Sequence, residues 1–248
     1  MAIQLQNLGV AFGQRTILEG LDLTFDEGRI TAVMGPNGCG KTTLLRCIGG
    51  LILPQNGQVI IDGKPVGDYS ARELARKVAF VRQHPQTDFE FSAFETVLMG
   101  RNPYQHRLQN ESQADWDIVE EAMRQTGTWH LRLAKPHQMS GGELQRVMIA
   151  RALAQQTPIL LMDEPVSNLD IAHQIGIMHL LHSATSKTTL IVIHDLNLAR
   201  ALCDNLLLLH EGKALYHGPI ADGLTPDNIK RVYGVHATIA DGHIVFDY

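Results

Sequence analysis

One stretch of the chain has the spacing of a phosphate-binding loop. Residues 35–42 read Gly-Pro-Asn-Gly-Cys-Gly-Lys-Thr. Glycines let successive backbone N–H groups turn toward one anion, and the positive end of a following helix adds its field. Lys41 can then reach the β- and γ-phosphates of a nucleotide, and Thr42 can ligate Mg²⁺. The expected nucleotide contacts are Gly35, Pro36, Asn37, Gly38, Cys39, Gly40, Lys41, Thr42 and Thr43.

Two adjacent carboxylates, Asp163 and Glu164, follow the apolar run 159–162. A carboxylate at the end of a buried strand is costly unless it has a partner such as a hydrated Mg²⁺ that bridges to phosphates. Because neighbouring strand residues point to opposite sides, we expect Asp163 to face the metal and Glu164 to act as general base on a water. An isolated acidic pair is often a solvated strand end, but the phosphate loop favours the catalytic interpretation.

A serine and two glycines begin a third segment that could bind an anion. Ser140 stands three residues before Glu143, which is the spacing of a capping box at a helix N-terminus. Capping alone accounts for this pair, but Gly141 and Gly142 disfavour a helix and are not needed for capping. They leave open amides beside a hydroxyl at the positive end of a helix. We expect both roles together.

Apolar runs mark the elements that must position these side chains. Residues 30–34 lead into the phosphate loop, whereas 159–162 and 189–193 are continuous apolar runs typical of parallel strands covered on both faces. Between the last two, residues 170–184 favour a helix. In a β-α-β order the carboxyl ends of the strands meet at one edge of an open sheet, where ligands bind. We expect this edge to carry Gln83, Asp163, Glu164 and His194.

The remaining segments predict a β-rich flank and a helical insertion. Leu21, Leu23 and Phe25 alternate as in an antiparallel strand. From 92 to 156 helical signals recur without a strong strand signal, and Trp116, Val119 and Met123 have a helical spacing that predicts core positions. Further signals are strands over 59–61 and 78–81, helix caps at Ser70 and Ser92, and a hairpin of 236–239 and 243–246 around Asp241-Gly242. We expect one α/β domain over 1–248, with a helical subdomain over 92–156 inserted in its core.

The composition is that of an ordinary globular protein. Of the 248 residues, 44% are hydrophobic and 19% charged, and the net charge is -5. Since no block of Lys or Arg occurs, nucleic acid is a disfavoured partner. The apolar runs are far shorter than the roughly 20 residues that span a bilayer, and the N-terminus lacks a signal-peptide pattern. Three unpatterned cysteines favour a reducing compartment, so we expect the chain in the cytosol.

Two other groups of reactive side chains predict no site of their own. Cys39 is either a reactive thiol near a helix N-terminus or, as we expect, a small filler of the loop. His173, His179 and His182 do not share one helix face with Cys or carboxylate ligands, so we expect them at the surface rather than at a metal.

Together, these motifs resemble those of an ATP-binding-cassette (ABC) nucleotide-binding subunit. The phosphate loop, Gln83 after a strand, the Ser140-Gly141-Gly142 signature, the acidic pair, residues 167–170 (Ser-Asn-Leu-Asp) and His194 occur in the family's order. The resemblance covers essentially the whole chain. It implies a P-loop NTPase core of α/β class, with an N-terminal antiparallel β subdomain and an inserted helical subdomain.

The resemblance also implies a role for each motif. Phe12 stacks on adenine, Gln83 contacts Mg²⁺ and reports the γ-phosphate to a membrane partner, and His194 holds the γ-phosphate and the attacking water. Two copies of the chain form a homodimer that sandwiches two ATP molecules, each between the phosphate loop of one copy and the signature of the other. The implied catalytic residues are Glu164, His194, Lys41 and Gln83, the implied Mg²⁺ ligands are Thr42, Gln83 and Asp163, and the signature contacts are Ser140, Gly141 and Gly142.

Stretches outside the shared motifs resemble the ATPases of bacterial importers for iron chelates, haem or cobalamin. They are 72–76, 97–103, 194–199 and 224–226. This resemblance implies membrane permease subunits as partners, a substrate-binding protein that acts indirectly, and peripheral attachment to the cytoplasmic face of the bacterial inner membrane. Similar stretches occur in metal-ion importers, so a free metal ion remains an alternative cargo.

Two other classes of protein fit the sequence less well. A soluble cassette protein that acts on nucleic acid or ribosomes usually has two cassettes or long helical arms and basic surfaces. A small-molecule kinase or GTPase has no use for a second anion site, and the chain lacks the N-K-x-D guanine motif. Four residues depart from the commoner family pattern without removing a phosphate or metal contact: Arg82, Met139, Val166 and Asn168.

Overall fold

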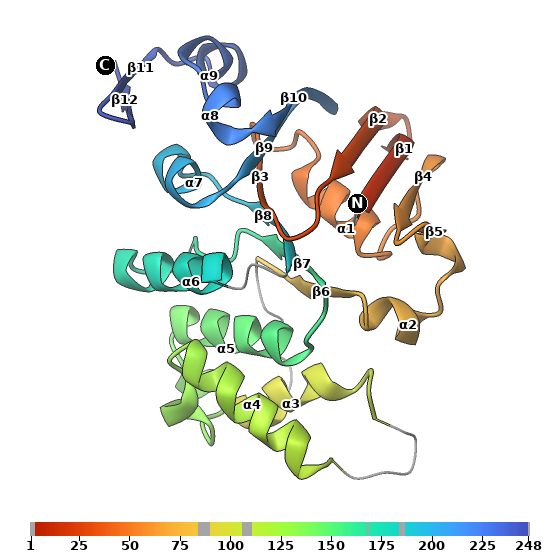
Figure 1. Cartoon of the computed structure of the whole chain (residues 1–248), viewed down its shortest axis with the longest axis vertical. Helices are drawn as coiled ribbons and strands as arrows, with labels where there is room; N and C mark the ends of the chain where they lie inside the picture. Colours follow the sequence, from red (N-terminus) through yellow and green to blue (C-terminus); the bar gives the residue numbers. More distant parts are fainter. Residues whose placement is uncertain (1–2, 84–89, 106–110, 168, 184–186, 248) are drawn as a thin grey trace.

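A six-stranded sheet forms the centre of the protein (Figure 1). The computed structural model describes residues 3–83, 90–105, 111–167, 169–183 and 187–247. The strand order is β10-β9-β3-β8-β7-β6, and all neighbours are parallel except β10 with β9. The strands are β3 (Ile30–Met34), β6 (Val78–Val81), β7 (Ile159–Asp163), β8 (Thr188–Val192), β9 (Asn205–His210) and β10 (Lys213–Pro219).

The central strands are buried on both faces, as their continuous apolar runs predict. Every residue of β3, β7 and β8 is buried. Ala32 and Met34 belong to one core cluster, whereas Val33 between them belongs to the other. Because side chains alternate across a strand, the sheet separates two apolar layers that each cover one of its faces. The sheet edge is therefore held rigidly from both sides.

A second, antiparallel sheet covers one face. Its order is β2-β1-β4-β5, with β1 (Ile3–Phe12), β2 (Arg15–Phe25), β4 (Asn56–Ile61) and β5 (Lys64–Pro65). Leu21, Leu23 and Phe25 are buried, which confirms the alternation read from the sequence. The helix α1 (Lys41–Ile48) lies between this sheet and the central one (Figure 1) and buries Leu44 and Leu45 in the shared core.

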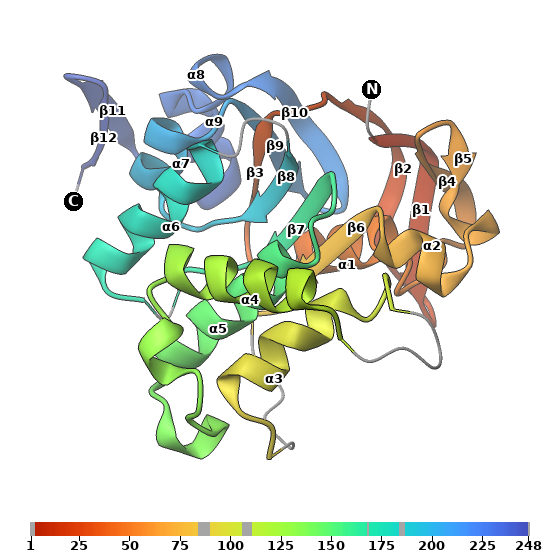
Figure 2. The same ribbon diagram turned by 60° about the horizontal axis from the view of Figure 1, so that its bottom comes forward.

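Helices cover the opposite face and one end of the central sheet (Figures 1 and 2). The expected region 92–156 contains helices only, as far as its described residues show. The helices are α2 (Ala71–Ala75), α3 (Ala93–Leu98), α4 (Gln113–Gln125), α5 (Gly141–Ala154), α6 (Ile171–Ser183), α7 (Leu196–Leu202), α8 (Ile220–Gly223) and α9 (Pro226–Tyr233), with single 3₁₀ turns at 66–68, 99–101, 129–131 and 136–138. None of the helices among the described residues is long and apolar enough to span a membrane.

The predicted helix starts are confirmed. Ser70, Ser92 and Ser140 each cap a helix through a complete capping box. Val119 and Met123 of α4 are buried as predicted, but Trp116 is 49% exposed, so its assignment to the core is wrong. Its ring packs edge-on against Phe94 at 5.6 Å on the rim of the helical region. A large aromatic ring covers one neighbour and still leaves its outer face to solvent.

Two arginines hold the helical region to the end of α2. Arg72 Nε and Arg76 Nε both donate to the carbonyl of Pro103, at 2.9 and 2.8 Å. The next residue, Tyr104, lies under two guanidinium groups, those of Arg76 and Arg101, at 5.4 and 4.3 Å. The stretches 72–76 and 97–103, which the sequence set apart from the shared motifs, therefore meet in space.

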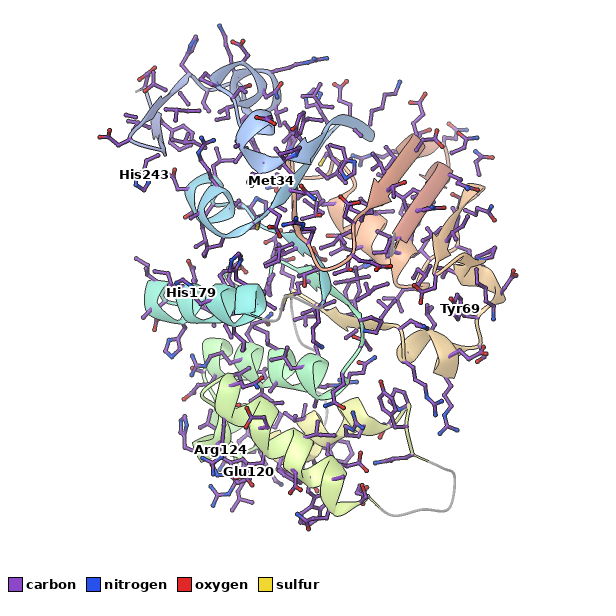
Figure 3. The ribbon with its side chains drawn as sticks, viewed as in Figure 1. Met34, Tyr69, Glu120, Arg124, His179 and His243 are labelled. Carbon is purple, nitrogen blue, oxygen red and sulfur yellow. The ribbon has the colours of Figure 1, made fainter. Side chains whose placement is uncertain are left out.

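The chain ends in the expected hairpin. Strands β11 (Ala237–Ala240) and β12 (His243–Phe246) pair antiparallel around Asp241-Gly242. Asn197 of α7 fixes the hairpin by accepting from the amide of Ile244 at 2.7 Å and donating to its carbonyl at 3.1 Å. His173, His179 and His182 of α6 are exposed, as predicted; His179 is labelled in Figure 3.

Candidate functional site

The phosphate loop joins the end of β3 to the start of α1. Gly35 has a φ of 146°, and a Cβ there would lie 2.1 Å from the carbonyl oxygen of Leu209. Gly40 has a φ of 107°, and a Cβ there would lie 2.5 Å from the side chain of Leu18. Any other residue would need both strain and displacement of neighbours. The two glycines therefore fix the path of the loop.

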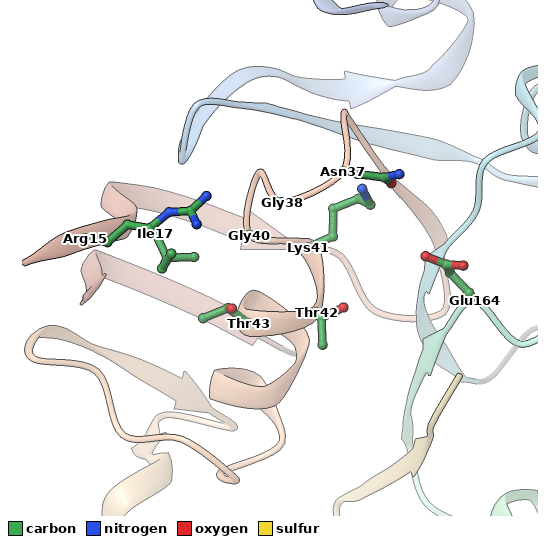
Figure 4. A pocket seen from close by; sticks show the side chains of 9 residues that line it. All are labelled: Arg15, Ile17, Asn37, Gly38, Gly40, Lys41, Thr42, Thr43 and Glu164. Carbon is green, nitrogen blue, oxygen red and sulfur yellow. The ribbon is translucent and has the colours of Figure 1, made fainter. Parts of the chain in front are cut away.

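The ammonium group of Lys41 is hydrogen-bonded to backbone carbonyls of the phosphate loop. Its Nζ donates to the carbonyls of Gly35 and Pro36, both at 2.9 Å, and the residue is 6% exposed. Since the loop wraps a buried positive charge, its interior attracts an anion. Asn37 of the same loop lines the same cavity as Lys41 (Figure 4).

Asp163 and Thr42 offer oxygen ligands to a cation. The Thr42 hydroxyl donates to Oδ1 of Asp163 at 3.0 Å. Burial raises the pKa of the Asp163 carboxyl, although the hydrogen bond from Thr42 opposes that shift. A buried carboxylate without a close cationic partner is unfavourable, and carboxylate and hydroxyl oxygens are the ligands that Mg²⁺ takes. These two residues therefore fit a magnesium ion.

Glu164 is held from two sides. Oε1 lies 2.7 Å from Nε2 of His194, and Oε2 accepts from Nε2 of Gln83 at 2.5 Å. The residue follows the last residue of β7 and has a φ of 49°. Its backbone is therefore left-handed and not the extended conformation on which we based the expected strand alternation.

The strand order explains why these residues meet. The strands β3, β8, β7 and β6 are consecutive neighbours in the sheet. The phosphate loop follows β3, His194 follows β8, Asp163 ends β7 with Glu164 directly after it, and Gln83 follows β6. Four neighbouring strands thus deliver all of the predicted sheet-edge side chains to one place, at the carboxyl edge where open α/β sheets bind ligands.

A cavity extends from Glu164 across the phosphate loop to β2. Its walls include Asn37, Gly38, Gly40, Lys41, Thr42 and Thr43, together with Arg15 and Ile17 (Figure 4). Arg15 and Ile17 had no motif to reveal them, because only the pairing of β1 with β2 brings them to the loop. Phe12 lies opposite Arg15 in that pairing and is 53% exposed. An aromatic face is thus available beside the cavity.

Cys39 is a buried part of the loop rather than an accessible thiol. It is 6% exposed, and burial raises the pKa of its thiol. Because the thiolate is the reactive form, this environment disfavours reaction. The sulfur lies 2.8 Å from the position that a Cβ on Gly35 would take. Cys39 therefore fills space under the loop, as we expected.

The signature forms a separate hollow. Ser140, Gly141, Gly142, Glu143, Arg146, Leu169, Asp170 and His173 line it, and among the described residues none of these lines the cavity at the phosphate loop. Ser140 caps α5 and its backbone amide donates to Glu143 at 2.8 Å. Arg146 is 8% exposed, and its Nε has no hydrogen-bond partner among the described residues. The hollow thus combines a helix N-terminus with a buried cation.

Asp170 of this hollow is fixed by the helix that follows it. It accepts from the backbone amide of His173 at 2.9 Å, and its two carboxylate oxygens lie 2.7 and 2.8 Å from Nδ1 of the same histidine. These hydrogen bonds lower the pKa of the Asp170 carboxyl. Asn168, a departure from the family pattern, lies outside the described residues.

Comparison with known proteins agrees with this geometry. The family model for "ABC transporter" matches residues 18–167. Hemin import ATP-binding protein HmuV of Bordetella avium (strain 197N) is 40% identical over 96% of this chain and 94% of its own length. Ferric enterobactin transport ATP-binding protein FepC of Escherichia coli (strain K12) is 37% identical over 95% of this chain and 88% of its own length. Iron(3+)-hydroxamate import ATP-binding protein FhuC of Bacillus subtilis (strain 168) is 35% identical over 96% of this chain and 90% of its own length.

Solved structures show the same fold. An inward-facing ABC transporter assigned to the metal-chelate type has a TM-score of 0.84 and 27% identity, over 100% of this chain and 97% of that one. The cassette MJ0796, in a dimeric post-hydrolysis state with ADP and phosphate, has a TM-score of 0.79 and 31% identity, over 88% of this chain and 98% of that one. The expected fold of an α/β core with an antiparallel β sheet is confirmed. The chain belongs to the ABC transporter family.

Proposed function

We propose that the chain is the ATP-hydrolysing subunit of a bacterial importer for a metal chelate of the iron-siderophore, haem or cobalamin type. The observation that carries this proposal is the convergence of Gln83, Asp163, Glu164 and His194 on the phosphate loop. The relatives named for hemin, ferric enterobactin and iron(3+)-hydroxamate support the cargo class. A free metal ion is the alternative cargo.

In hydrolysis, Glu164 is the general base that takes a proton from the attacking water. His194 and Gln83 orient its carboxylate, and each of its oxygens keeps a second lone pair that can accept from water. Lys41 binds the β- and γ-phosphates from inside the loop. When bound, Mg²⁺ would be held by Thr42, Gln83 and Asp163 and would neutralise charge on those phosphates.

The signature completes the nucleotide site of a second copy. Its hollow offers the hydroxyl of Ser140 and the first amides of α5 to an anion, yet it shares no described residue with the cavity at the phosphate loop. A homodimer in which each ATP lies between the phosphate loop of one copy and the signature of the other uses both surfaces. The dimeric form of the cassette MJ0796 supports this arrangement.

Transport follows from a difference in affinity. ATP at both sites favours the closed dimer, and hydrolysis with phosphate loss favours the open one. The dimer drives partner permease subunits in the membrane, and a substrate-binding protein acts on those permeases rather than on this chain. We place the chain at the cytoplasmic face of the bacterial inner membrane, as a peripheral subunit without a nucleic-acid partner. The helical region 92–156 receives the permease.

A mixing experiment tests the shared site. Lys41→Ala damages the phosphate loop and Gly142→Asp damages the signature, so either homodimer has two damaged sites. A mixed dimer has one site with both lesions and one with neither. In transporters assembled from an equal mixture, about half of the dimers are mixed and half of their sites are intact, so roughly a quarter of wild-type ATPase activity should return.

Each variant assembled alone is the control and should have almost no activity. If the mixture is no more active than the two variants measured separately, the signature does not serve the partner's nucleotide and the proposal fails. An ATPase rate that is normal in the Lys41→Ala transporter would contradict the phosphate-loop assignment itself.

A further inference from the structure

Arg15 reaches over the phosphate loop from outside every recognised motif. It is the first residue of β2 and lines the same cavity as Gly38, Gly40 and Thr43. Its Nη2 lies 3.9 Å from the position that a Cβ on Gly38 would occupy. In Figure 4 the side chain of Arg15, which is exposed, extends from the strand toward the loop.

The charge of Arg15 has no carboxylate partner among the residues that the structure describes. Some arginines of the described chain do pair with a carboxylate: Arg29 pairs with Asp204 at 3.1 Å, and Arg124 pairs with Glu120 at 2.6 Å. Within the described part of the chain, no carboxylate lies within ion-pair distance of Arg15. An arginine beside a loop that already holds a lysine ammonium adds like charge to the cavity, and a bound anion would be stabilised by both groups.

The ends of the cavity set the direction of a bound nucleotide. Lys41, Thr42 and Glu164 lie at one end, where the terminal phosphates are held and hydrolysed. Arg15 and Ile17 form the opposite wall (Figure 4). A nucleotide whose terminal phosphates lie at the first end therefore directs its α-phosphate and nucleoside toward the second.

We infer that Arg15 binds the α-phosphate of the nucleotide, as a phosphate ligand additional to the loop. This inference rests on the proposed function, because it requires ATP in the cavity. Guanidinium groups match phosphate oxygens with two parallel N–H donors. Phe12, opposite Arg15 across the β1–β2 pairing and exposed, offers an aromatic face to the base, which leaves the guanidinium for the phosphate.

Equilibrium binding to the full-length chain tests the inference. Mg-ATP, Mg-GTP and inorganic tripolyphosphate are titrated into wild type, Arg15→Gln and Arg15→Lys, with Arg124→Gln as the control for an exposed arginine elsewhere. Loss of one charge-assisted hydrogen-bonding group predicts about a tenfold rise in Kd for Arg15→Gln with all three ligands. Arg15→Lys keeps the charge but loses the two parallel N–H donors, so its Kd values should lie between those of wild type and Arg15→Gln. Arg124→Gln should have the Kd values of wild type.

The outcomes separate the inference from the proposal on which it rests. Unchanged Kd values in Arg15→Gln, with normal binding by wild type, would overturn the assignment of Arg15 alone. A loss confined to Mg-ATP, with Mg-GTP and tripolyphosphate unaffected, would also overturn it, because the contact would then be to the base. Failure of wild type to bind any of the three ligands would overturn the proposed function and this inference together. Equal melting temperatures of wild type and Arg15→Gln verify that the variant is folded.

Discussion

The imidazole Nε2 of His194 lies 2.7 Å from Oε1 of Glu164, and the two residues follow adjacent parallel strands. Gln83 holds the other carboxylate oxygen from the strand on the far side. Three neighbouring strand ends thus fix one carboxylate. A general base works only when its lone pairs are held within reach of the proton that it takes, so this relationship is the structural basis of the proposed hydrolysis.

Replacing Glu164 with Gln keeps the shape of the side chain and removes the base. We expect ATP turnover to fall by about 10²- to 10⁴-fold while the affinity for ATP changes little, because the amide still occupies the space between His194 and Gln83. Glu121→Gln on α4 is the matched control and should leave turnover unchanged. Turnover near the wild-type rate in the first variant would show that another group takes the proton.

Replacing Asp163 with Asn should separate stability from function. Burial raises the pKa of this carboxyl, so at neutral pH the ionised form opposes folding, and this cost grows as pH rises from the unfolded pKa toward the raised folded value. The Asn variant should therefore melt at a higher temperature in the absence of nucleotide. It should also need at least about tenfold more Mg²⁺ for half-maximal ATPase activity.

Thr42→Val is the companion variant, since it removes a hydroxyl and leaves the carboxylate. It should raise the Mg²⁺ requirement without raising the melting temperature. An Asn variant that melts below wild type at pH 7, or that has an unchanged Mg²⁺ requirement, contradicts the assignment of Asp163 as a buried metal ligand.

The buried pair Arg101–Asp115 should stabilise the helical region far more than the exposed pair Arg124–Glu120. Nε of Arg101 lies 2.8 Å from Oδ1 of Asp115, and the two side chains are 8% and 15% exposed. Arg101 also donates a hydrogen bond to the carbonyl of Ala154. The hydrogen bond that Arg101 donates to Asp115 lowers the pKa of the Asp115 carboxyl. Arg101→Met leaves a mostly buried carboxylate unpaired and should cost about 3 kcal/mol in the free energy of unfolding.

Arg124→Met is the control, because Arg124 and its partner Glu120 are both exposed. Both residues are labelled in Figure 3. Exposed pairs contribute below about 1 kcal/mol. Chemical denaturation of both variants and of the double variant Arg101→Met with Asp115→Leu checks the comparison. The double variant should be more stable than Arg101→Met, and equal losses at the two pairs would contradict the role assigned to burial.

His217 should make stability fall as the solution becomes acidic. It packs edge-on against Phe25 at 5.2 Å, and burial lowers the pKa of its imidazole, with Asp26 opposing the shift. The unfolded chain therefore binds a proton more readily below about pH 6.5, so stability is lost as pH falls from there toward the lower folded value. In His217→Gln the melting temperature should depend less on pH between 7 and 5, and an unchanged dependence would contradict this.

Much of the candidate site could be predicted because its signals are local. The phosphate loop needs glycines at fixed offsets, and the structure shows why at Gly35 and Gly40, where a Cβ would meet Leu209 or Leu18. The capping box at Ser140 depends on residues three apart and is equally readable. The end of β7 at Asp163 follows from a continuous apolar run.

Other features depend on pairings between distant segments. The order β3-β8-β7-β6 brings Gln83 to Glu164 across 81 residues, and no local pattern reveals that contact. Arg15 reaches the loop only through the β1–β2 pairing. Trp116 is half exposed because of the way in which α4 packs against α3. The left-handed backbone of Glu164 is a local departure that its residue type does not predict.

The central claim, that two copies share each nucleotide, is tested most directly by a structure of the Glu164→Gln chain bound to Mg-ATP. The decisive measurement is the distance from the Ser140 hydroxyl and the Gly142 amide of one copy to the γ-phosphate bound by the other copy. The account predicts hydrogen-bond distances of about 3 Å. A nucleotide-bound structure in which these groups face solvent, or contact the ATP of their own phosphate loop, would contradict it.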